Sequence, residues 1–317
     1  MLNKITDNIL KGNKITKAEV LYLLNADINA LAEKANCIRI NFCGNKISLC
    51  SIISGKSGNC SENCKFCAQS GFHNTSFESY GFLEKEKIVE DCKRHCKAGV
   101  HRYSIVTVGR ALNGIDFNKA VNAYKSMREE CPEIGLCASH GLLSCEQLKM
   151  LKNSGVTRYH CNIETSQNYF SKICTTHSFK DKINTIKAAK RAGLEICSGG
   201  IIGMGETMED RIDMAFILAG LEVNSIPINI LTPIKNTPLE NAEPLSEDEI
   251  IRTVAVFRFI NPSADIRIAA GRSKMSDNGI KAFFSGANAT ITGDFLTTTG
   301  STINKDKEMF SNNGFEI

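Results

Sequence analysis

The 317-residue sequence predicts an α/β fold, a (β/α)8 barrel of the TIM type with an N-terminal helical cap. Short β-rich runs alternate with amphipathic helical patterns from about residue 47 to residue 295, and no Pro/Gly/Ser-rich linker interrupts them. Such alternation requires parallel strands with crossover helices, and eight units of roughly 30 residues suit a closed barrel better than an open sheet. Functional side chains are then expected at the carboxyl ends of the strands.

The chain divides into three predicted segments. Residues 1–40 have a helical pattern, with Leu21, Leu24, Ile28 and Leu31 on one face, and are expected to cap the bottom of the barrel. Residues 41–300 form the barrel, and residues 301–317 form a C-terminal tail whose last fifteen residues are expected to be loose. The eight predicted strands are 47–53, 102–108, 134–139, 156–164, 194–202, 226–231, 265–270 and 287–292.

Capping patterns mark the helices between these strands. Residues 144–147 and 246–249 each match a capping box, in which a serine is followed three residues later by Gln or Glu. Gly99 and Gly193 stand where two other helical patterns end, as glycine does at a helix C-terminus. Helices therefore separate the strands throughout the barrel segment.

Composition excludes several classes of function. A net charge of +4 is too small to indicate nucleic-acid binding, and 42% hydrophobic with 23% charged residues is ordinary for a globular protein. Neither an apolar run of membrane-spanning length nor a cleavable signal is found, so we expect a cytoplasmic protein with no membrane association.

The 14 cysteines are the unusual number in this composition. Disulfides are rare in a reducing compartment, so metal or redox chemistry is the leading explanation. For most of the cysteines the alternative is favoured, that they are small buried hydrophobic residues. Cys92 and Cys96, one helical turn apart on an apolar face, are interpreted in this way.

Cys60, Cys64 and Cys67 form a C-x3-C-x2-C motif on a loop directly after the first strand. Structural zinc and electron-transfer clusters require four ligands, whereas a cubane held by three cysteines leaves one iron open. That iron can chelate S-adenosylmethionine, whose reductive cleavage gives a 5'-deoxyadenosyl radical. Three unrelated cysteines, or a zinc site completed elsewhere, are the alternatives. With Phe66 before the third cysteine, the motif resembles the radical S-adenosylmethionine superfamily signature.

Two further segments support this resemblance. Residues 199–206 follow the fifth predicted strand and resemble the glycine-containing segment by which the superfamily cradles adenine; the alternative is a plain strand exit with unusual dihedral angles. Asn162 and Glu164 alternate on the fourth predicted strand and would point the same way, an amide and a carboxylate suited to ribose hydroxyls. A hydrogen-bonded core pair is the alternative for these two.

Nearly the whole chain resembles the biotin synthase family, in residues 47–70, 197–200, 226–231, 267–272 and 286–293. The resemblance implies a (β/α)8 sulfurtransferase that inserts sulfur between two unactivated carbons of dethiobiotin. Two S-adenosylmethionine molecules are cleaved, and an auxiliary iron-sulfur cluster supplies sulfide. The resemblance also implies a homodimer and a reducing flavodoxin or ferredoxin as electron donor.

The resemblance further implies a role for individual residues. Cys60, Cys64 and Cys67 would hold a 4Fe-4S cluster, and Asn229 would contact dethiobiotin. Cys137, Cys197 and Arg267 would hold the auxiliary cluster. The residues implied around S-adenosylmethionine are Asn162, Glu164, Lys182, Gly199, Gly200, Ile201, Gly203 and Glu206.

The auxiliary site departs from the family pattern. Ser104 stands on the second strand where the usual third cysteine is expected, and Cys161 is an additional cysteine on the fourth strand. The auxiliary cluster is then either the common 2Fe-2S type or a variant that draws on Cys137, Cys161 and Cys197, and the chain resembles biotin synthases of obligate anaerobes. If Asn162 faces inward, alternation turns Cys161 outward, so Cys161 is either a ligand at a bulge or strand end or a buried thiol.

Two competing hypotheses remain at this point. A related radical enzyme, such as a hydrogenase-maturation or methylornithine enzyme, is disfavoured by the set of Cys137, Cys197 and Arg267. A non-catalytic iron-sulfur or zinc scaffold predicts that reduced protein releases no 5'-deoxyadenosine from S-adenosylmethionine.

Overall fold

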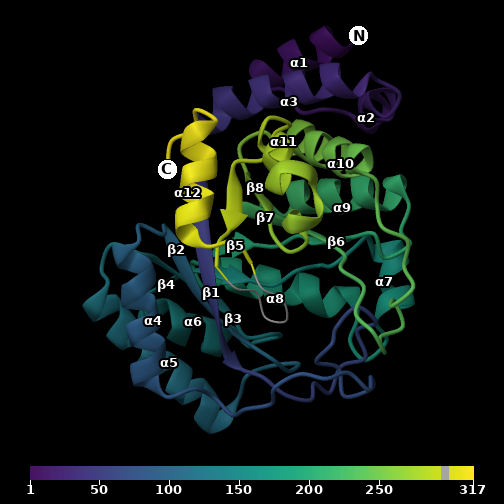
Figure 1. Ribbon diagram of the computed structural model, residues 1–317. Coiled ribbons are helices and arrows are strands. Elements are labelled where there is room, and N and C mark those ends of the chain that lie inside the picture. Colours follow the sequence, from purple (N-terminus) through teal and green to yellow (C-terminus); the bar gives the residue numbers. More distant parts are fainter. Residues whose placement is uncertain (294–299) are drawn as a thin grey trace.

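A closed parallel β-sheet forms the centre of the computed structural model, which describes residues 1–293 and 300–317 (Figure 1). Residues 294–299, at the end of the predicted barrel segment, lie outside the described residues. The sheet order is β5-β4-β3-β2-β1-β9-β8-β7-β6, and a further pairing of β5 with β7 closes the ring. Within the described ranges the strands are β1 Ser48–Lys56, β2 Arg102–Thr107, β3 Gly135–Ser139, β4 Val156–His160, β5 Glu195–Cys197, β6 Gly200–Ile202, β7 Ser225–Ile230, β8 Asp265–Ile268 and β9 Ala289–Ile291.

The predicted fifth strand is broken into two pieces, so the prediction of one continuous strand over 194–202 is wrong in this detail. β5 and β6 are separated by Ser198 and Gly199, and both pair with β7. A side chain at Gly199 would place its Cβ 2.0 Å from the carbonyl oxygen of Pro227 on β7, so the strands approach too closely for any other residue. Because β5 and β6 occupy one position in the ring, the predicted eight-membered (β/α)8 barrel is confirmed.

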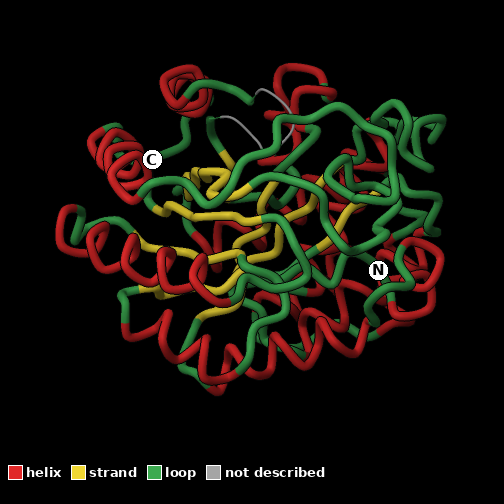
Figure 2. Tube along the Cα trace, turned by 90° about the horizontal axis from the view of Figure 1, so that it is seen from below, coloured by secondary structure: helices red, strands yellow, loops and turns green. Residues whose placement is uncertain are grey.

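Helices surround the barrel on its outside (Figure 2). The predicted capping boxes are present at Ser144 and Ser246, and Gly99 and Gly193 adopt positive φ angles just after α4 and α8. Cys92 on α4 is fully buried in the core, as expected. The outer helices are α4 Lys85–Lys97, α5 Gly114–Glu130, α6 Cys145–Asn153, α7 Gln167–Ile173, α8 Phe179–Arg191, α9 Met208–Gly220, α10 Glu247–Ile260 and α11 Ile280–Phe283, the last preceded by two 3-10 turns.

The N-terminal segment is helical, as predicted, but does not present a single apolar face. α1 Leu2–Leu10, α2 Lys17–Leu23 and α3 Ile28–Cys43 are separate helices, and Asp27 caps the start of α3. This break leaves Leu21 44% exposed, so its predicted place on the apolar face is wrong. α3 packs along α10, and Cys43 contacts the carbonyl oxygen of Pro262 in the loop before β8 (3.8 Å). The segment therefore lies near the amino ends of strands (Figure 1).

The C-terminal residues are not the loose tail expected from the sequence. They form α12 Ile303–Asn312, on which the fully buried Phe310 packs edge-on against Phe283, with ring centroids 4.7 Å apart. Asp306 on the same helix makes a buried ion pair with Arg272 (2.5 Å). The last residues then return to β1, where the carbonyl of Glu316 accepts a hydrogen bond from the Ile47 amide (2.8 Å). Throughout the described part of the chain, the helices are too short or too polar to cross a membrane.

Candidate active site

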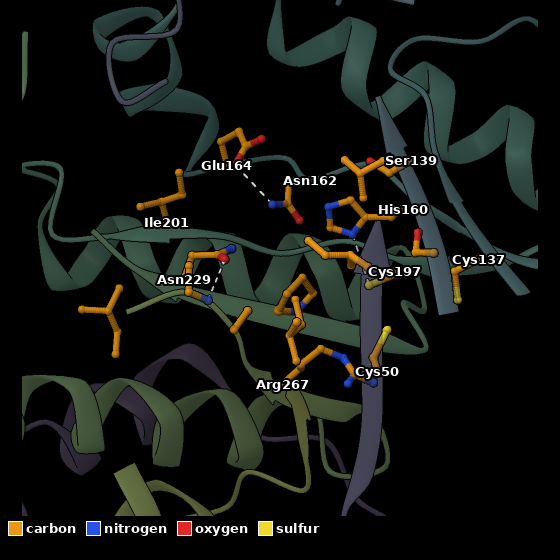
Figure 3. A pocket seen from close by; sticks show the side chains of 18 of the residues that line it. Cys50, Cys137, Ser139, His160, Asn162, Glu164, Cys197, Ile201, Asn229 and Arg267 are labelled. Carbon is orange, nitrogen blue, oxygen red and sulfur yellow. Dashed lines mark hydrogen bonds between the residues drawn. The ribbon is translucent and has the colours of Figure 1, made fainter. Parts of the chain in front are cut away.

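A cavity of about 360 Å³ lies inside the barrel (Figure 3). The predicted site residues that line it are Ser104, Cys137, Asn162, Glu164, Cys197, Ile201, Asn229 and Arg267. Phe66 from the cysteine loop and Glu164, four residues beyond the end of β4, mark its mouth at the carboxyl ends of the strands. Figure 3 shows Glu164 and Ile201 toward one end, and Cys50, Cys137 and Cys197 near Arg267 at the other. The barrel thus places the deep thiols and Phe66 of the cysteine loop around one space, although Cys60, Cys64 and Cys67 do not themselves line it.

Cys60, Cys64 and Cys67 form the outer site, on the loop that follows β1. All three are partly buried. The loop is held by backbone hydrogen bonds, from the Cys60 amide to the Gln69 carbonyl (2.7 Å) and from the Gly71 amide to the Cys60 carbonyl (2.8 Å). Three thiols on one rigid loop, beside an aromatic residue at the cavity mouth, are the donor set that a three-cysteine cubane requires.

A fourth thiol lies beside the outer site, and the sequence reasoning missed it. Cys174, just after α7, has its Sγ 3.7 Å from Sγ of Cys64 and 3.3 Å from Nδ1 of His177. His177 is in turn paired with the buried carboxylate of Glu62 (2.5 Å). The hydrogen bond with Cys64, and then that with His177, lower the pKa of Cys174 to about 3, although burial opposes this. Cys174 could have been found from the sequence by the Cys-x2-His spacing of residues 174–177.

Asn162 and Glu164 lie together in the cavity, but in the turn after β4 and not on the strand. The Asn162 amide nitrogen lies 3.4 Å from a Glu164 carboxylate oxygen, and the Asn162 carbonyl oxygen accepts from the Gly199 amide (3.0 Å). Glu164 has a φ of +69°, so a turn and not strand alternation directs its side chain. Lys182 on α8 reaches to 4.0 Å from Glu164. An amide, a carboxylate and an ammonium therefore converge beside the outer site.

The glycine-containing segment 199–206 contributes Ile201 directly to the cavity wall. A Cβ at Gly200 would lie 2.2 Å from the carbonyl oxygen of Glu164, so this glycine makes room for the neighbouring backbone. The Glu206 carboxylate accepts hydrogen bonds from the amides of Gly203 (2.8 Å) and Met204 (2.7 Å) and pairs with the buried Arg211 (2.7 Å). Glu206 therefore fixes the turn around Gly203 and does not line the cavity.

Cys137 on β3, Cys197 on β5 and Arg267 on β8 form the inner site, at the deep end of the cavity. Nδ1 of His160 lies 3.3 Å from Sγ of Cys197. Arg267 donates to the Thr290 carbonyl (2.7 Å), while its second terminal nitrogen is buried and has no hydrogen-bond partner among the described residues.

Ser104, also in the wall of the cavity, has a buried hydroxyl without a partner in the described chain. The Arg267 nitrogen has only a long ion-pair contact, with Asp265 at 3.9 Å. Buried polar groups are nearly always hydrogen-bonded, so these two groups without hydrogen bonds beside several thiols indicate that a further group binds there.

Cys50 on β1 also belongs to the cavity wall, although the sequence reasoning did not select it. The neighbouring Cys137 thiol raises the pKa of Cys50, as does burial, and the Cys50 thiol lowers the pKa of Cys137, although burial opposes this. Positive charge from Arg102 and Arg158 also lowers the pKa of Cys137. β1 carries both serine and apolar residues on each of its faces, so its pattern did not show which residues point inward.

Cys161 lies outside the cavity. Its side chain is 5% exposed and belongs to the apolar core. His160 and Asn162, on either side of it, both line the cavity, so alternation turns Cys161 to the outer layer. Of the two interpretations drawn from the sequence, this position favours a buried thiol.

Known protein families match both halves of the chain. The radical SAM superfamily matches residues 56–218, and the biotin and thiamin synthesis associated domain matches residues 227–316. The biotin synthase of Alkaliphilus metalliredigens is 59% identical over 100% of this chain and 99% of its own length. Those of Clostridium beijerinckii and Brachyspira hyodysenteriae are 56% and 52% identical, each over 100% of this chain and over 100% and 95% of their own lengths.

Solved structures share the fold at low sequence identity. Methylornithine synthase superposes with a TM-score of 0.86 at 20% identity, covering 98% of this chain and 96% of that one. A maturase of the FeFe-hydrogenase gives a TM-score of 0.85 at 17% identity, covering 99% and 74%. At these identities the likeness supports the barrel architecture alone.

Proposed function

The chain belongs to the biotin synthase family within the radical SAM superfamily, and its function is that of a biotin synthase. From this premise we propose that the outer and inner sites divide the reaction between radical formation and sulfur supply. The observation that carries the proposal is that the thiols of the inner site line one end of a cavity, and Phe66 of the cysteine loop lines the same cavity together with Asn162 and Glu164. Dethiobiotin would lie between the outer and inner sites.

At the outer site, Cys60, Cys64 and Cys67 would hold a 4Fe-4S cluster with S-adenosylmethionine beside it. When bound, this pair supplies a carbon radical able to abstract hydrogen from C–H bonds that have no acidic proton. Asn162 and Glu164 offer an amide and a carboxylate to ribose hydroxyls, and Lys182 places a positive charge beside that carboxylate. Glu206 acts indirectly, because it holds the turn that follows Ile201.

At the inner site, Cys137, Cys197 and Arg267 would hold the auxiliary cluster, which supplies the sulfur atom when bound. Asn229 lies between the two sites; its amide donates to the Gly200 carbonyl (3.1 Å) and accepts from the Ala270 amide (3.2 Å). Each of these uses one hydrogen or one lone pair, so Asn229 keeps one of each for the polar ring of dethiobiotin. Neighbouring apolar residues exclude water and suit its aliphatic chain, namely Val106, Ile201, Ile230, Leu231 and Ile234.

Further parts of the proposal rest on the family resemblance. A reducing flavodoxin or ferredoxin would deliver the electron to the outer site, and the enzyme would act as a homodimer in the cytoplasm. The N-terminal segment 1–40 would act as the cap of the barrel 41–300, because α3 already lies against α10. The auxiliary cluster would be a variant type, as Ser104 replaces the usual cysteine.

The test is anaerobic reconstitution with iron and sulfide, followed by incubation with dithionite, S-adenosylmethionine and dethiobiotin. We expect the wild type to yield 5'-deoxyadenosine and biotin by mass spectrometry. Cys64→Ala should lose both products, whereas Cys137→Ala should keep deoxyadenosine and lose biotin. Cys37→Ala, at an exposed cysteine on α3, is the control and should match the wild type. Deoxyadenosine without biotin from fully loaded wild type would overturn the assignment.

A further inference from the structure

We propose that Cys50 is the third thiolate of the inner site and replaces the cysteine that this chain lacks at Ser104. This inference rests on the proposed function, because it assumes that an auxiliary cluster binds at Cys137 and Cys197. Cys50 lines the same cavity as Cys137 and Cys197 and is 9% exposed. In Figure 3 it stands beside Arg267 at the deep end.

Strand register places Cys50 at the same level of the barrel as the other inner-site residues. Cys50 pairs with Arg102 on β2, which pairs with Gly135 on β3, two residues before Cys137. The same two-residue offset is found at each further step of two strands around the ring. The steps run from Cys137 to Cys197 across β4, from Cys197 to Arg267 across β7, and from Arg267 to Cys50 across β9. An offset of two residues for every two strands is the slope of an eight-stranded barrel with a shear of 8.

The four side chains therefore form one layer of the barrel. β5 and β6 share one ring position, so β1, β3, β5 and β8 are the first, third, fifth and seventh strands of the ring. In a TIM-type barrel, each interior layer receives four side chains from alternate strands. The layer here consists of Cys50, Cys137, Cys197 and Arg267, three thiols and one guanidinium.

Ser104 belongs to a different layer. It stands on β2, an even strand of the ring, and is two residues beyond Arg102, the register partner of Cys50. It therefore lies one layer nearer the cavity mouth than Cys50. A serine hydroxyl is also a harder and weaker ligand than a thiolate for the iron of a cluster. Cys50 thus supplies the missing soft ligand from the neighbouring strand, one layer deeper.

Two cations support thiolates at this level. Arg102 and Arg158 line the cavity on even strands, one layer below the thiols, since they are the register partners of Cys50 and Cys137. Both reach Glu195, at 2.9 and 3.0 Å, so their guanidinium groups are fixed in place. Positive charge close to a sulfur favours the thiolate over the thiol, and the thiolate is the form that binds metal.

The experiment removes the outer cluster so that the iron of the inner site can be counted alone. The full-length background carries Cys60→Ala, Cys64→Ala and Cys67→Ala and is reconstituted anaerobically with iron and sulfide. Cys50→Ala and the nearly isosteric Cys50→Ser are added separately to it, with Cys161→Ala as the matched control at a buried cysteine outside the cavity. Iron and acid-labile sulfide per chain and the Mössbauer spectrum are measured, and circular dichroism checks folding.

We expect Cys50→Ala and Cys50→Ser to lose at least four-fifths of the iron bound by the background, while Cys161→Ala keeps it. If both Cys50 variants keep the iron content and the Mössbauer spectrum of the background, the role of Cys50 is overturned and the proposed function stays intact. A background that binds no iron, although the wild type makes deoxyadenosine, would instead remove the inner cluster and with it the proposed function. Loss of iron in Cys161→Ala as large as in the Cys50 variants would also contradict the inference.

Discussion

Cys174 gives the outer site a neighbour that the three-cysteine motif does not include. The Sγ of Cys174 lies 3.7 Å from Sγ of Cys64 and 3.3 Å from Nδ1 of His177. His177 is in turn paired with Glu62. The hydrogen bond from Cys64 is the main cause of the low pKa of Cys174, and a metal-bound Cys64, being a thiolate, could no longer donate it. Cys174 would then keep its proton and be the donor. Hydrogen bonds to ligand sulfurs stabilise the more negative, reduced state of a cluster and raise its reduction potential.

We therefore predict that Cys174→Ala lowers the reduction potential of the outer cluster. A hydrogen bond to a charged group is worth about 1.5 kcal/mol, which corresponds to about 60 mV for a one-electron couple. An anaerobic redox titration followed by electron paramagnetic resonance measures the shift. Cys37→Ala, at an exposed cysteine, should leave the potential unchanged. Equal potentials in Cys174→Ala and the wild type would show that this thiol does not donate to Cys64.

Single residues also show what the sequence could and could not predict. The cysteine motif identified the outer site because its spacing is local, and Cys137, Cys197 and Arg267 were found through a family resemblance. Cys50 was missed because its importance depends on register across strands, which spacing along one strand does not reveal. Cys161 was a candidate ligand only because it is an additional cysteine. Strand alternation with Asn162 already argued that its side chain does not face the cavity, as the structure shows.

Among the elements, helix ends were predicted well and strand ends less well. Capping boxes and C-terminal glycines act within one turn, so Ser144 and Gly193 were recognised from neighbouring residues alone. β4 ends at His160, before the predicted 164, because Glu164 turns with a positive φ against Gly200. The break between β5 and β6 likewise depends on the approach of β7, a contact with residues far along the chain.

α12 is the element that the sequence misjudged most, and its attachment can be tested. Asp306 pairs with Arg272, and both side chains are almost completely buried. Asp306→Ala would leave the Arg272 charge buried without this partner, which typically costs about 3–5 kcal/mol. We predict a loss of this size in the free energy of unfolding, measured by urea denaturation of the reconstituted chain.

Glu308→Ala is the matched control for this prediction, because Glu308 lies on the same helix but is exposed. It should change the free energy of unfolding by less than about 0.5 kcal/mol. If the two variants unfold at the same urea concentration, α12 does not contribute to the folded barrel as its contacts indicate.

At the scale of the whole molecule, barrel closure and the inner site depend on each other. The ring closes where β5 meets β7, through the pairing of Cys197 with Ser225. Cys197 is thus both a member of the inner layer and the last residue of β5 before the break at Ser198 and Gly199. Any change that separates β5 and β6 from β7 should move Cys197 out of the barrel layer that it shares with Cys50 and Cys137.

Gly199→Ala tests this dependence. The new methyl group would lie 2.0 Å from the Pro227 carbonyl oxygen, which belongs to a central strand and cannot move away freely. Overpacking of this kind costs about 1–3 kcal/mol or more, so we predict a clear fall in melting temperature together with loss of iron from the inner site. Gly220→Ala is the control, since nothing lies within 4 Å of a Cβ there and α9 ends at this residue. Alanine favours a helix over glycine by about 0.5–1 kcal/mol, so the control should melt no lower than the wild type. Normal melting and full iron content in Gly199→Ala would show that the closing contact tolerates a side chain and that the inner layer does not rely on it.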